Sequence, residues 1–97
     1  MTEQPAVAPH QAIVRIVNKR GLHARASAKF VTLAAAFTAR VVVAKDGSEV
    51  AGTSIMGLMM LAAALGDEIH ISAHGPDAAE ALAALVALVG NRFDEGE

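Results

Sequence analysis

The sequence has 97 residues, of which 54% are hydrophobic and 19% charged, and it contains no cysteine. This length allows one small domain, and the composition excludes disulfide bonds and thiolate chemistry and favours a reducing, cytoplasmic location. The formal net charge of −2 argues against a general nucleic-acid-binding protein, and no run approaches the roughly 20 apolar residues that span a membrane.

The first predicted element is a strand. Residues 1–11 contain two prolines and no apolar run, so we expect a disordered leader and not a signal peptide. Over residues 12–18 apolar side chains alternate, with Val14 and Ile16 on one face and Arg15 on the other. This alternation is typical of a strand with one buried face, and a loop follows it.

A helix is predicted over residues 24–36, because apolar residues recur there with helical spacing. His23 stands at its start, as the N-cap or next to it, although histidine is not a favoured capping residue. Helix stability therefore does not explain this histidine. The buried stripe of the helix is predicted to contain Ala26, Phe30, Leu33, Ala34 and Phe37.

A hairpin and a short helix come next. Residues 40–45 are rich in β-branched side chains, Asp46-Gly47 is a strong turn signal, and residues 48–51 form the predicted return strand. Ser54 then opens a helix that we expect to end near Met60. A serine hydroxyl at the N-cap suits this role, because it accepts a hydrogen bond from an unpaired backbone N–H.

The last third of the chain predicts one more strand and one more helix. Residues 68–73 alternate, and the Gly75-Pro76-Asp77 break precedes a helical segment that Gly90 can end. Asp77 and Glu80 resemble a capping box at the start of this helix. The strand is predicted to bury Ile69, Ile71 and Ala73, and the helix to bury Leu82, Leu85, Val86 and Val89.

The order of the predicted elements is βαββαβα. Since each strand buries one face, we expect an α+β fold in which helices cover one side of an antiparallel sheet. The domain is expected to cover residues 12–90, between the leader at 1–11 and an acidic C-terminal tail at 91–97.

The cluster Gly21-Leu22-His23-Ala24-Arg25-Ala26-Ser27 predicts the functional site. A neutral imidazole is a good nucleophile, and here it meets the unpaired N–H groups of a helix start and the guanidinium of Arg25. These groups suit a phosphoryl group or another anion. The alternative is an exposed histidine in a basic loop. A metal site is not expected, because His70 and His74 lack a third ligand with suitable spacing.

A second candidate surface lies in the short helix after Ser54. Methionine side chains are adaptable, and three of them within five residues suit a surface that docks protein partners. Phosphorylation of Ser54 would add a charge of about −1.5 to −2 beside this surface and would repel an acidic partner. The alternative is a short helix that is simply buried. We assign Leu58, Leu61 and Leu65 to the core and Ile55, Met56 and Met59 to the docking surface.

Together these segments resemble the HPr family, the histidine phosphocarrier proteins of the bacterial phosphoenolpyruvate-dependent phosphotransferase system. The segment Gly21–Arg25 is similar to the active-site motif of the family, and the segment Ser54–Leu58 is similar to its regulatory-serine motif. The resemblance runs from about residue 12 to residue 89. It implies an open-faced β-sandwich, in which three helices cover one side of a four-stranded antiparallel sheet.

The resemblance implies a role for each motif. His23 would accept a phosphoryl group on Nδ1 from phosphorylated enzyme I and pass it to an EIIA protein or domain, with Arg25 steadying the phosphate. Ser54 would be the target of HPr kinase/phosphorylase. The protein would act as a monomeric carrier without a cofactor, rather than as an independent enzyme. The residues expected to contact partners are Leu22, Arg25, Ala26, Ser27, Ile55, Met56 and Met59.

One position departs from the sugar-type members of this family. Many of them have proline after the arginine, whereas this chain has Ala26, a form similar to that of the nitrogen-type carriers called NPr. Two pathways therefore stay open, carbohydrate uptake and a nitrogen-type regulatory relay. A second hypothesis is that the chain is a regulatory module of such a relay, which acts mainly by phosphorylation-dependent binding of proteins.

Overall fold

The computed structural model of the protein describes residues 10–95. Strands and helices follow the predicted order βαββαβα, and one short 3-10 turn comes after the last helix. No helix in this range is long and apolar enough to cross a membrane. The elements are β1 (His10–Arg15), α1 (Ala24–Ala35), β2 (Arg40–Lys45), β3 (Ser48–Ala51), α2 (Ile55–Met60), β4 (Glu68–His74), α3 (Ala78–Gly90) and η1 (Arg92–Asp94).

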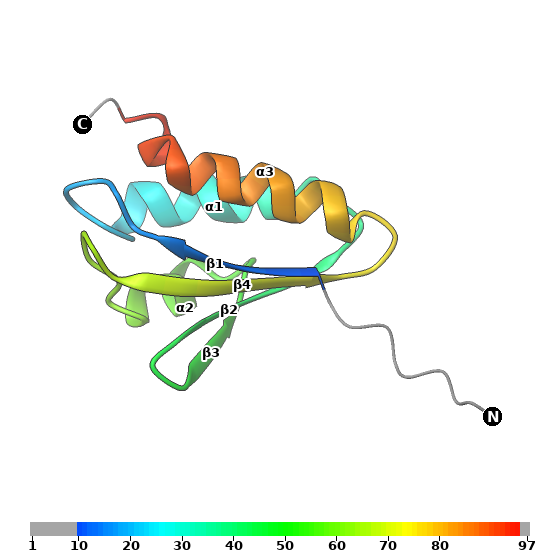
Figure 1. Ribbon diagram of the computed structural model, residues 1–97, viewed down its shortest axis with the longest axis horizontal. Helices are drawn as coiled ribbons and strands as arrows, with labels where there is room; N and C mark the ends of the chain where they lie inside the picture. Colours follow the sequence, from blue (N-terminus) through cyan, green and yellow to red (C-terminus); the bar gives the residue numbers. More distant parts are fainter. Residues whose placement is uncertain (1–9, 96–97) are drawn as a thin grey trace.

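The four strands form one sheet in the order β1-β4-β2-β3, in which every pair of neighbours is antiparallel. The helices α1 and α3 lie side by side along one face of this sheet, and α2 packs against α1 and β3 (Figure 1). The predicted architecture, an antiparallel sheet covered on one side by helices, is confirmed. It brings the C-terminal end of α3 near the loop that joins β1 to α1 (Figure 1).

The core lies between the sheet and the two long helices. In β4 the buried residues follow the predicted alternation, and in α1 they follow most of the predicted stripe. Full burial of one large apolar side chain stabilises a fold by about 1.5–3 kcal/mol, so both elements contribute to the stability of the domain. The residues that they bury are Ile69, Ile71 and Ala73 in β4, and Ala26, Ser27, Phe30 and Ala34 in α1.

The predicted side-chain roles of Leu65 and Asp77 are wrong. Leu65 is 57% exposed and not part of the core, because it lies in the loop between α2 and β4. Asp77 is the N-cap of α3, but its carboxylate does not cap this helix. Instead, Oδ2 of Asp77 accepts a hydrogen bond of 2.7 Å from the backbone N–H of Thr38, which ties the start of α3 to the segment between α1 and β2.

The buried face of α3 is rotated slightly from the predicted one. Leu88 is buried in place of Leu82 and Val86, which are half-buried, and Gly90 is the last residue of the helix rather than the residue after it. At the end of α1 and just beyond it, Leu33 and Phe37 are half-buried as well.

The fold extends past the predicted limits of the domain at both ends. β1 begins at His10, inside the segment expected to be a leader. After α3, Phe93 is fully buried, so the expected tail contributes one side chain to the core, while Asn91, Arg92 and Asp94 are exposed. Residues 1–9 and 96–97, the remainder of the expected leader and tail, lie outside the described residues.

Candidate active site

A close approach between two loops sets the start of α1. Gly21 has a left-handed backbone conformation (φ +63°), and a Cβ atom there would lie 2.2 Å from the carbonyl oxygen of Ala63. The backbone N–H of Leu22 donates to the same oxygen at 3.0 Å. Glycine alone fits this position without displacing the backbone, so the contact fixes how the chain enters α1.

His23 is the N-cap of α1, as the sequence predicts. Its backbone is extended (φ −73°, ψ −179°), and its carbonyl oxygen accepts the N–H of Ser27 at 2.9 Å. The imidazole makes no capping hydrogen bond, so the ring does not perform the task that usually selects an N-cap side chain. The backbone N–H groups of Ala24, Arg25 and Ala26 have no partner within the helix and point toward its start.

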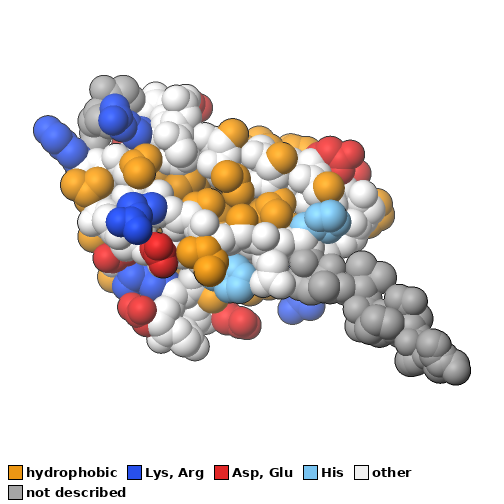
Figure 2. Space-filling model, viewed as in Figure 1, with side chains coloured by type: hydrophobic (Ala, Val, Ile, Leu, Met, Phe, Trp, Pro, Cys, Tyr) orange, Lys and Arg blue, Asp and Glu red, His pale blue; other side chains and the backbone are white. Residues whose placement is uncertain are grey.

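Arg25 lies in the first turn of α1 and is exposed. It makes no ion pair with any residue of the range 10–95. Together with Lys29 and Asp94 it lines a hollow of about 590 Å³. Figure 2 shows Lys and Arg side chains at this end of the molecule, with Asp and Glu side chains among them. A guanidinium without an internal partner is available to an incoming anion, and its planar fork suits phosphate oxygens.

A carboxylate from the other end of the chain reaches the candidate nucleophile. Oε2 of Glu95 lies 2.8 Å from Nε2 of His23, and the two side chains are only 7% and 19% exposed. The sequence does not predict this contact, because its C-terminal acidic residues resemble a tail outside the domain. The signal that the chain packs again after α3 is the aromatic residue Phe93, in a sequence that has only three such residues.

Phe93 anchors this C-terminal segment. Its side chain is fully buried, and its carbonyl oxygen accepts a hydrogen bond of 2.7 Å from Nζ of Lys29 in α1. Arg92, Phe93 and Asp94 all have left-handed backbone conformations, with φ of 56°, 53° and 61°. Each such residue costs roughly 1–2 kcal/mol when it is not glycine, so the burial of Phe93 and the bond from Lys29 must offset that cost.

Asn18 joins the C-terminal segment to the loop before α1. It is fully buried, and its Nδ2 donates to the carbonyl oxygen of Gly21 at 2.9 Å and to Oε1 of Glu95 at 3.4 Å. Its Oδ1 has no hydrogen-bond partner among residues 10–95. One amide therefore supports both the glycine that directs the chain into α1 and the carboxylate beside His23.

The helix α2 presents an apolar surface next to α1. Oγ of Ser54 accepts the backbone N–H of Gly57 at 2.9 Å, so Ser54 caps this helix as predicted. Leu58 and Leu61 are buried in the core. The exposed fractions of the other large side chains are 41% for Ile55, 67% for Met56, 39% for Met59 and 76% for Met60. The alternative prediction of a helix that is simply buried is therefore wrong.

Known proteins match the chain over nearly all of its described residues. Residues 10–91 match the family model PTS-HPr, described as the PTS HPr component phosphorylation site. The phosphocarrier protein HPr of Cupriavidus necator is 52% identical over 82 residues, which cover 84% of this chain and 92% of that protein. The phosphocarrier protein NPr of Escherichia coli is 43% identical over 83 residues, which cover 84% and 92%. A crystal structure of HPr from Thermoanaerobacter tengcongensis has a TM-score of 0.85 at 42% identity, and the match covers 89% of this chain and 97% of that one.

This chain belongs to the HPr family. The resemblance carried by the two motifs is thereby confirmed, and so is the open-faced sandwich that it implied. The role of the chain is that of a phosphocarrier of the phosphotransferase system, whose proteins include enzyme I and EIIA. The matching family model ends at residue 91, so the contact between Glu95 and His23 lies partly beyond the segment that this model describes.

Three residues that were expected to contact partners are buried in this HPr fold. Leu22 is 4% exposed, and Ala26 and Ser27 are fully buried. Oγ of Ser27 donates to the carbonyl oxygen of Leu22 at 3.1 Å, which braces the entry into α1 from inside. These three side chains therefore lie inside the fold and not on its surface, whereas Ala24 and Arg25 of the same motif are exposed.

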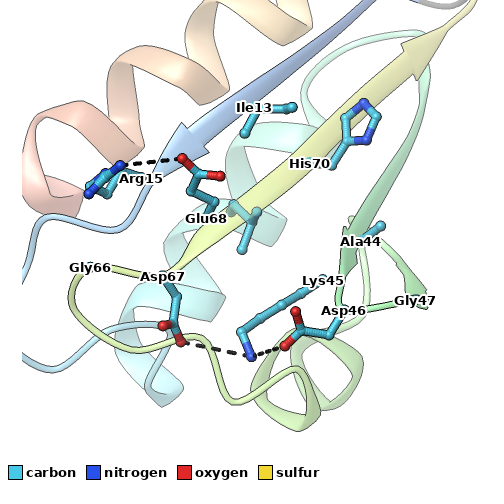
Figure 3. A pocket seen from close by; sticks show the side chains of 11 residues that line it. Ile13, Arg15, Ala44, Lys45, Asp46, Gly47, Gly66, Asp67, Glu68 and His70 are labelled. Atoms are coloured by element: carbon cyan, nitrogen blue, oxygen red, sulfur yellow. Dashed lines mark hydrogen bonds and ion pairs between the residues drawn. The ribbon is translucent and has the colours of Figure 1, made fainter.

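A second hollow, of about 610 Å³, lies over strands β1, β4 and β2 and the turn after β2. Figure 3 shows that its charges pair with one another: Arg15 with Glu68 at 3.3 Å, and Lys45 with Asp46 at 3.0 Å and Asp67 at 3.8 Å. The hydrogen bond to Asp46, aided by the charges of both aspartates, raises the pKa of Lys45. Because these cations already have partners, we assign no anion site to this hollow. No group of three His, Cys, Asp or Glu side chains within residues 10–95 is placed to hold a metal ion.

Proposed function

We propose that His23 carries the phosphoryl group of this HPr-family protein, on its Nδ1 atom. The observation that supports this assignment is the position of His23 at the N-cap of α1, with a ring that does not cap the helix and with exposed Arg25 in the first turn. In this proposal phosphorylated enzyme I is the donor, and an EIIA protein or domain is the acceptor. The carrier acts as a monomer in the cytoplasm.

Each transfer exchanges one bond to phosphorus for another. In the first transfer the lone pair of Nδ1 forms a bond to phosphorus while the bond from phosphorus to the donor atom of enzyme I breaks, and that atom keeps the electron pair. In the second transfer the acceptor attacks phosphorus and Nδ1 leaves. The charge on the phosphoryl oxygens is met by the unpaired N–H groups at the start of α1 and by the guanidinium of Arg25.

Partner docking is assigned to the exposed residues Ile55, Met56 and Met59 together with Arg25. Since α2 packs against α1, the apolar surface and the cation Arg25 lie on neighbouring helices, and α1 is the helix that His23 caps. Flexible methionine side chains can adapt to partners of different shape, which suits a carrier that must meet both a donor and an acceptor.

Ser54 is proposed as the regulatory site for HPr kinase/phosphorylase. It is half-buried and directly precedes the exposed Ile55 and Met56. A phosphate there would add a charge of about −1.5 to −2 at the edge of the apolar surface, where it would oppose an acidic partner. Because negative charge at a helix N-terminus favours the helix, the effect is expected on docking and not on folding.

Incubation with enzyme I and phosphoenolpyruvate tests the carrier role. The wild type is expected to acquire acid-labile phosphate, and His23→Ala is expected to acquire none. His70→Ala is a matched control, since it removes a histidine from an exposed position of β4 and should leave labelling unchanged. Phosphate that still appears on His23→Ala would refute the assignment.

The second hypothesis, a module that acts mainly by binding, makes a different prediction for the same variants. It expects His23→Ala to bind every partner as the wild type does and Met56→Asp to bind none. The proposed carrier instead requires His23 for transfer and the α2 surface for docking, so both variants should fail in a complete relay from phosphoenolpyruvate to EIIA.

A further inference from the structure

The contact between Glu95 and His23 determines which ring nitrogen holds the proton. A neutral imidazole has one nitrogen that donates an N–H and one that accepts, whereas an ionised carboxylate only accepts. Since Oε2 of Glu95 lies 2.8 Å from Nε2, a hydrogen bond there requires the proton on Nε2. The lone pair then remains on Nδ1, which has no hydrogen-bond partner among residues 10–95.

We propose that Glu95 is a positioning residue for phosphoryl transfer by His23, an inference that rests on the proposed carrier function. Glu95 fixes the orientation of the ring and keeps the proton on Nε2 through both transfers. When Nδ1 bonds to phosphorus, the proton stays on Nε2 and the ring becomes cationic, and the carboxylate compensates that charge. When Nδ1 leaves, the proton is still on Nε2, so the ring departs as neutral imidazole and no proton has to move.

The carboxylate is held in place by contacts that do not involve the histidine ring. Phe93 is buried two residues earlier, its carbonyl oxygen accepts the bond from Lys29, and Asn18 donates to the second carboxylate oxygen. These contacts come from the loop before α1 and from α1 itself. Glu95 therefore meets His23 as part of a packed segment, with a side chain that is only 7% exposed.

The same carboxylate also has an effect that would slow transfer instead of helping it: its negative charge repels the incoming phosphoryl group. The geometry favours positioning, because Oε2 faces Nε2 and not the nitrogen that bonds to phosphorus. In addition, the Asn18 amide donates a hydrogen bond to the Glu95 carboxylate, and the cations Arg25 and Lys29 line the adjacent hollow. Both reduce the repulsion. The two effects predict opposite changes in rate when the carboxylate is removed.

The rate test uses Glu95→Ala and Glu95→Gln in the full chain, with purified enzyme I and phosphoenolpyruvate. We expect kcat for phosphorylation of the carrier to fall about tenfold in Glu95→Ala, by analogy with the roughly 10–100-fold effects of removing a group that orients a metal-bound histidine. Glu95→Gln should lose less, because its amide oxygen can still accept the Nε2 proton. The KM for the carrier should stay unchanged, because the buried Glu95 lies outside the docking surface.

Glu80→Gln is the charge-matched control. It makes the same change in net charge in the first turn of α3, at the opposite end of that helix from Glu95, and should phosphorylate at the wild-type rate. Thermal unfolding of each variant separates a loss of stability from a loss of kcat.

A spectroscopic readout follows the proton directly. In 15N-labelled protein, NMR of the His23 ring should show a proton on Nε2 that exchanges slowly with water in the wild type. Glu95→Ala should speed this exchange strongly, which a merely structural change at the C-terminus would not do while the fold stays intact.

A Glu95→Ala rate equal to that of the wild type would overturn the proposal, and a faster rate would show that the carboxylate inhibits. In both cases the phosphate would still be on His23, so the carrier function would stand. The carrier function itself is tested separately: phosphate that appears on His23→Ala would refute it.

Discussion

Lys29 in α1 donates a hydrogen bond of 2.7 Å from Nζ to the carbonyl oxygen of Phe93, in the segment after α3. The helix that begins at the candidate nucleophile His23 thus also holds the segment that carries Glu95. This link makes the C-terminal segment part of the site, although the two ends of the contact between His23 and Glu95 are 72 positions apart in the sequence.

Lys29→Met should release this link while keeping the length and the apolar stem of the side chain. A hydrogen bond from a charged group contributes about 1.5–3 kcal/mol, and this one is only partly buried, so we expect a loss of about 1.5 kcal/mol. For a domain of 60–100 residues, each 1 kcal/mol lowers Tm by roughly 4–8 °C, which thermal unfolding can measure. Lys19→Met, in the exposed loop before α1, is the control and should melt as the wild type does. Equal melting of both variants would show that the bond from Lys29 does not hold the segment.

Gly21→Ala should damage both the fold and the site. The added Cβ would lie 2.2 Å from the carbonyl oxygen of Ala63, and alanine is strained at a φ of +63°. We expect a loss of at least about 3 kcal/mol, from strain of about 1–2 kcal/mol and from displaced backbone. Gly47→Ala separates the two causes, because Gly47 has a φ of +86° but no atom within 4 Å of the added Cβ. It should lose only the strain energy. Denaturant unfolding of the two variants gives the comparison, and equal losses would argue against the steric contact.

Arg25→Ala should slow phosphorylation without changing stability. The side chain is exposed and forms no ion pair within the described range, so the free energy of unfolding should change by less than about 0.5 kcal/mol. If the guanidinium meets the phosphoryl oxygens, its loss should lower the rate about 10²-fold, as for removal of one preorganised charge-stabilising group. Arg20→Ala, in the preceding exposed loop, is the control for the loss of one positive charge. The initial rate of phosphorylation by enzyme I is measured for both variants. Equal rates would show that Arg25 has no specific role in the site.

The features that the sequence predicts correctly are those that neighbouring residues determine. The turn at Gly21, the N-cap at Ser54 and the alternation in β4 are each determined by residues close together in the chain. Two contacts depend instead on packing between distant segments. The carboxylate of Asp77 binds the Thr38 N–H instead of capping α3, and Glu95 reaches His23 only because burial of Phe93 turns the chain back. A periodic pattern contains no information about such contacts.

Within the motif, helical spacing predicts the burial of Ala26 but not that of Ser27. Ser27 is polar and lies in the first turns of a helix, where solvent exposure is the ordinary expectation. In the structure its hydroxyl donates to the carbonyl oxygen of Leu22, and this hydrogen bond lets Ser27 be buried at little cost. The motif therefore combines exposed residues, such as Arg25, with buried residues that brace the loop.

Met56→Asp should weaken the binding of enzyme I and EIIA. Met56 is 67% exposed on α2, so the substitution leaves the core intact and places a charge in the apolar surface. Ile13→Asp is a closely matched control, because Ile13 is 66% exposed on β1 and outside that surface. We expect Met56→Asp to raise the Kd for partners at least tenfold, which is about 1.4 kcal/mol, and Ile13→Asp to leave it unchanged. Isothermal titration calorimetry with each partner measures the difference. If both variants bind equally well, docking through α2 is wrong.

Ser54→Asp should separate the charge at the α2 surface from the stability of the helix. Aspartate is a good N-cap and its charge suits a helix N-terminus, so the fold should keep its stability within about 1 kcal/mol. Ser54→Ala removes the oxygen that accepts the Gly57 N–H and should cost about 1 kcal/mol. Transfer from enzyme I should show the opposite order: Ser54→Asp raises the KM for the carrier several-fold, because its charge lies next to Ile55 and Met56, whereas Ser54→Ala transfers normally. Ser54→Asp is designed to disturb only docking, and Ser54→Ala only capping. Slow phosphoryl transfer to Ser54→Ala would therefore assign the effect to helix geometry and not to charge.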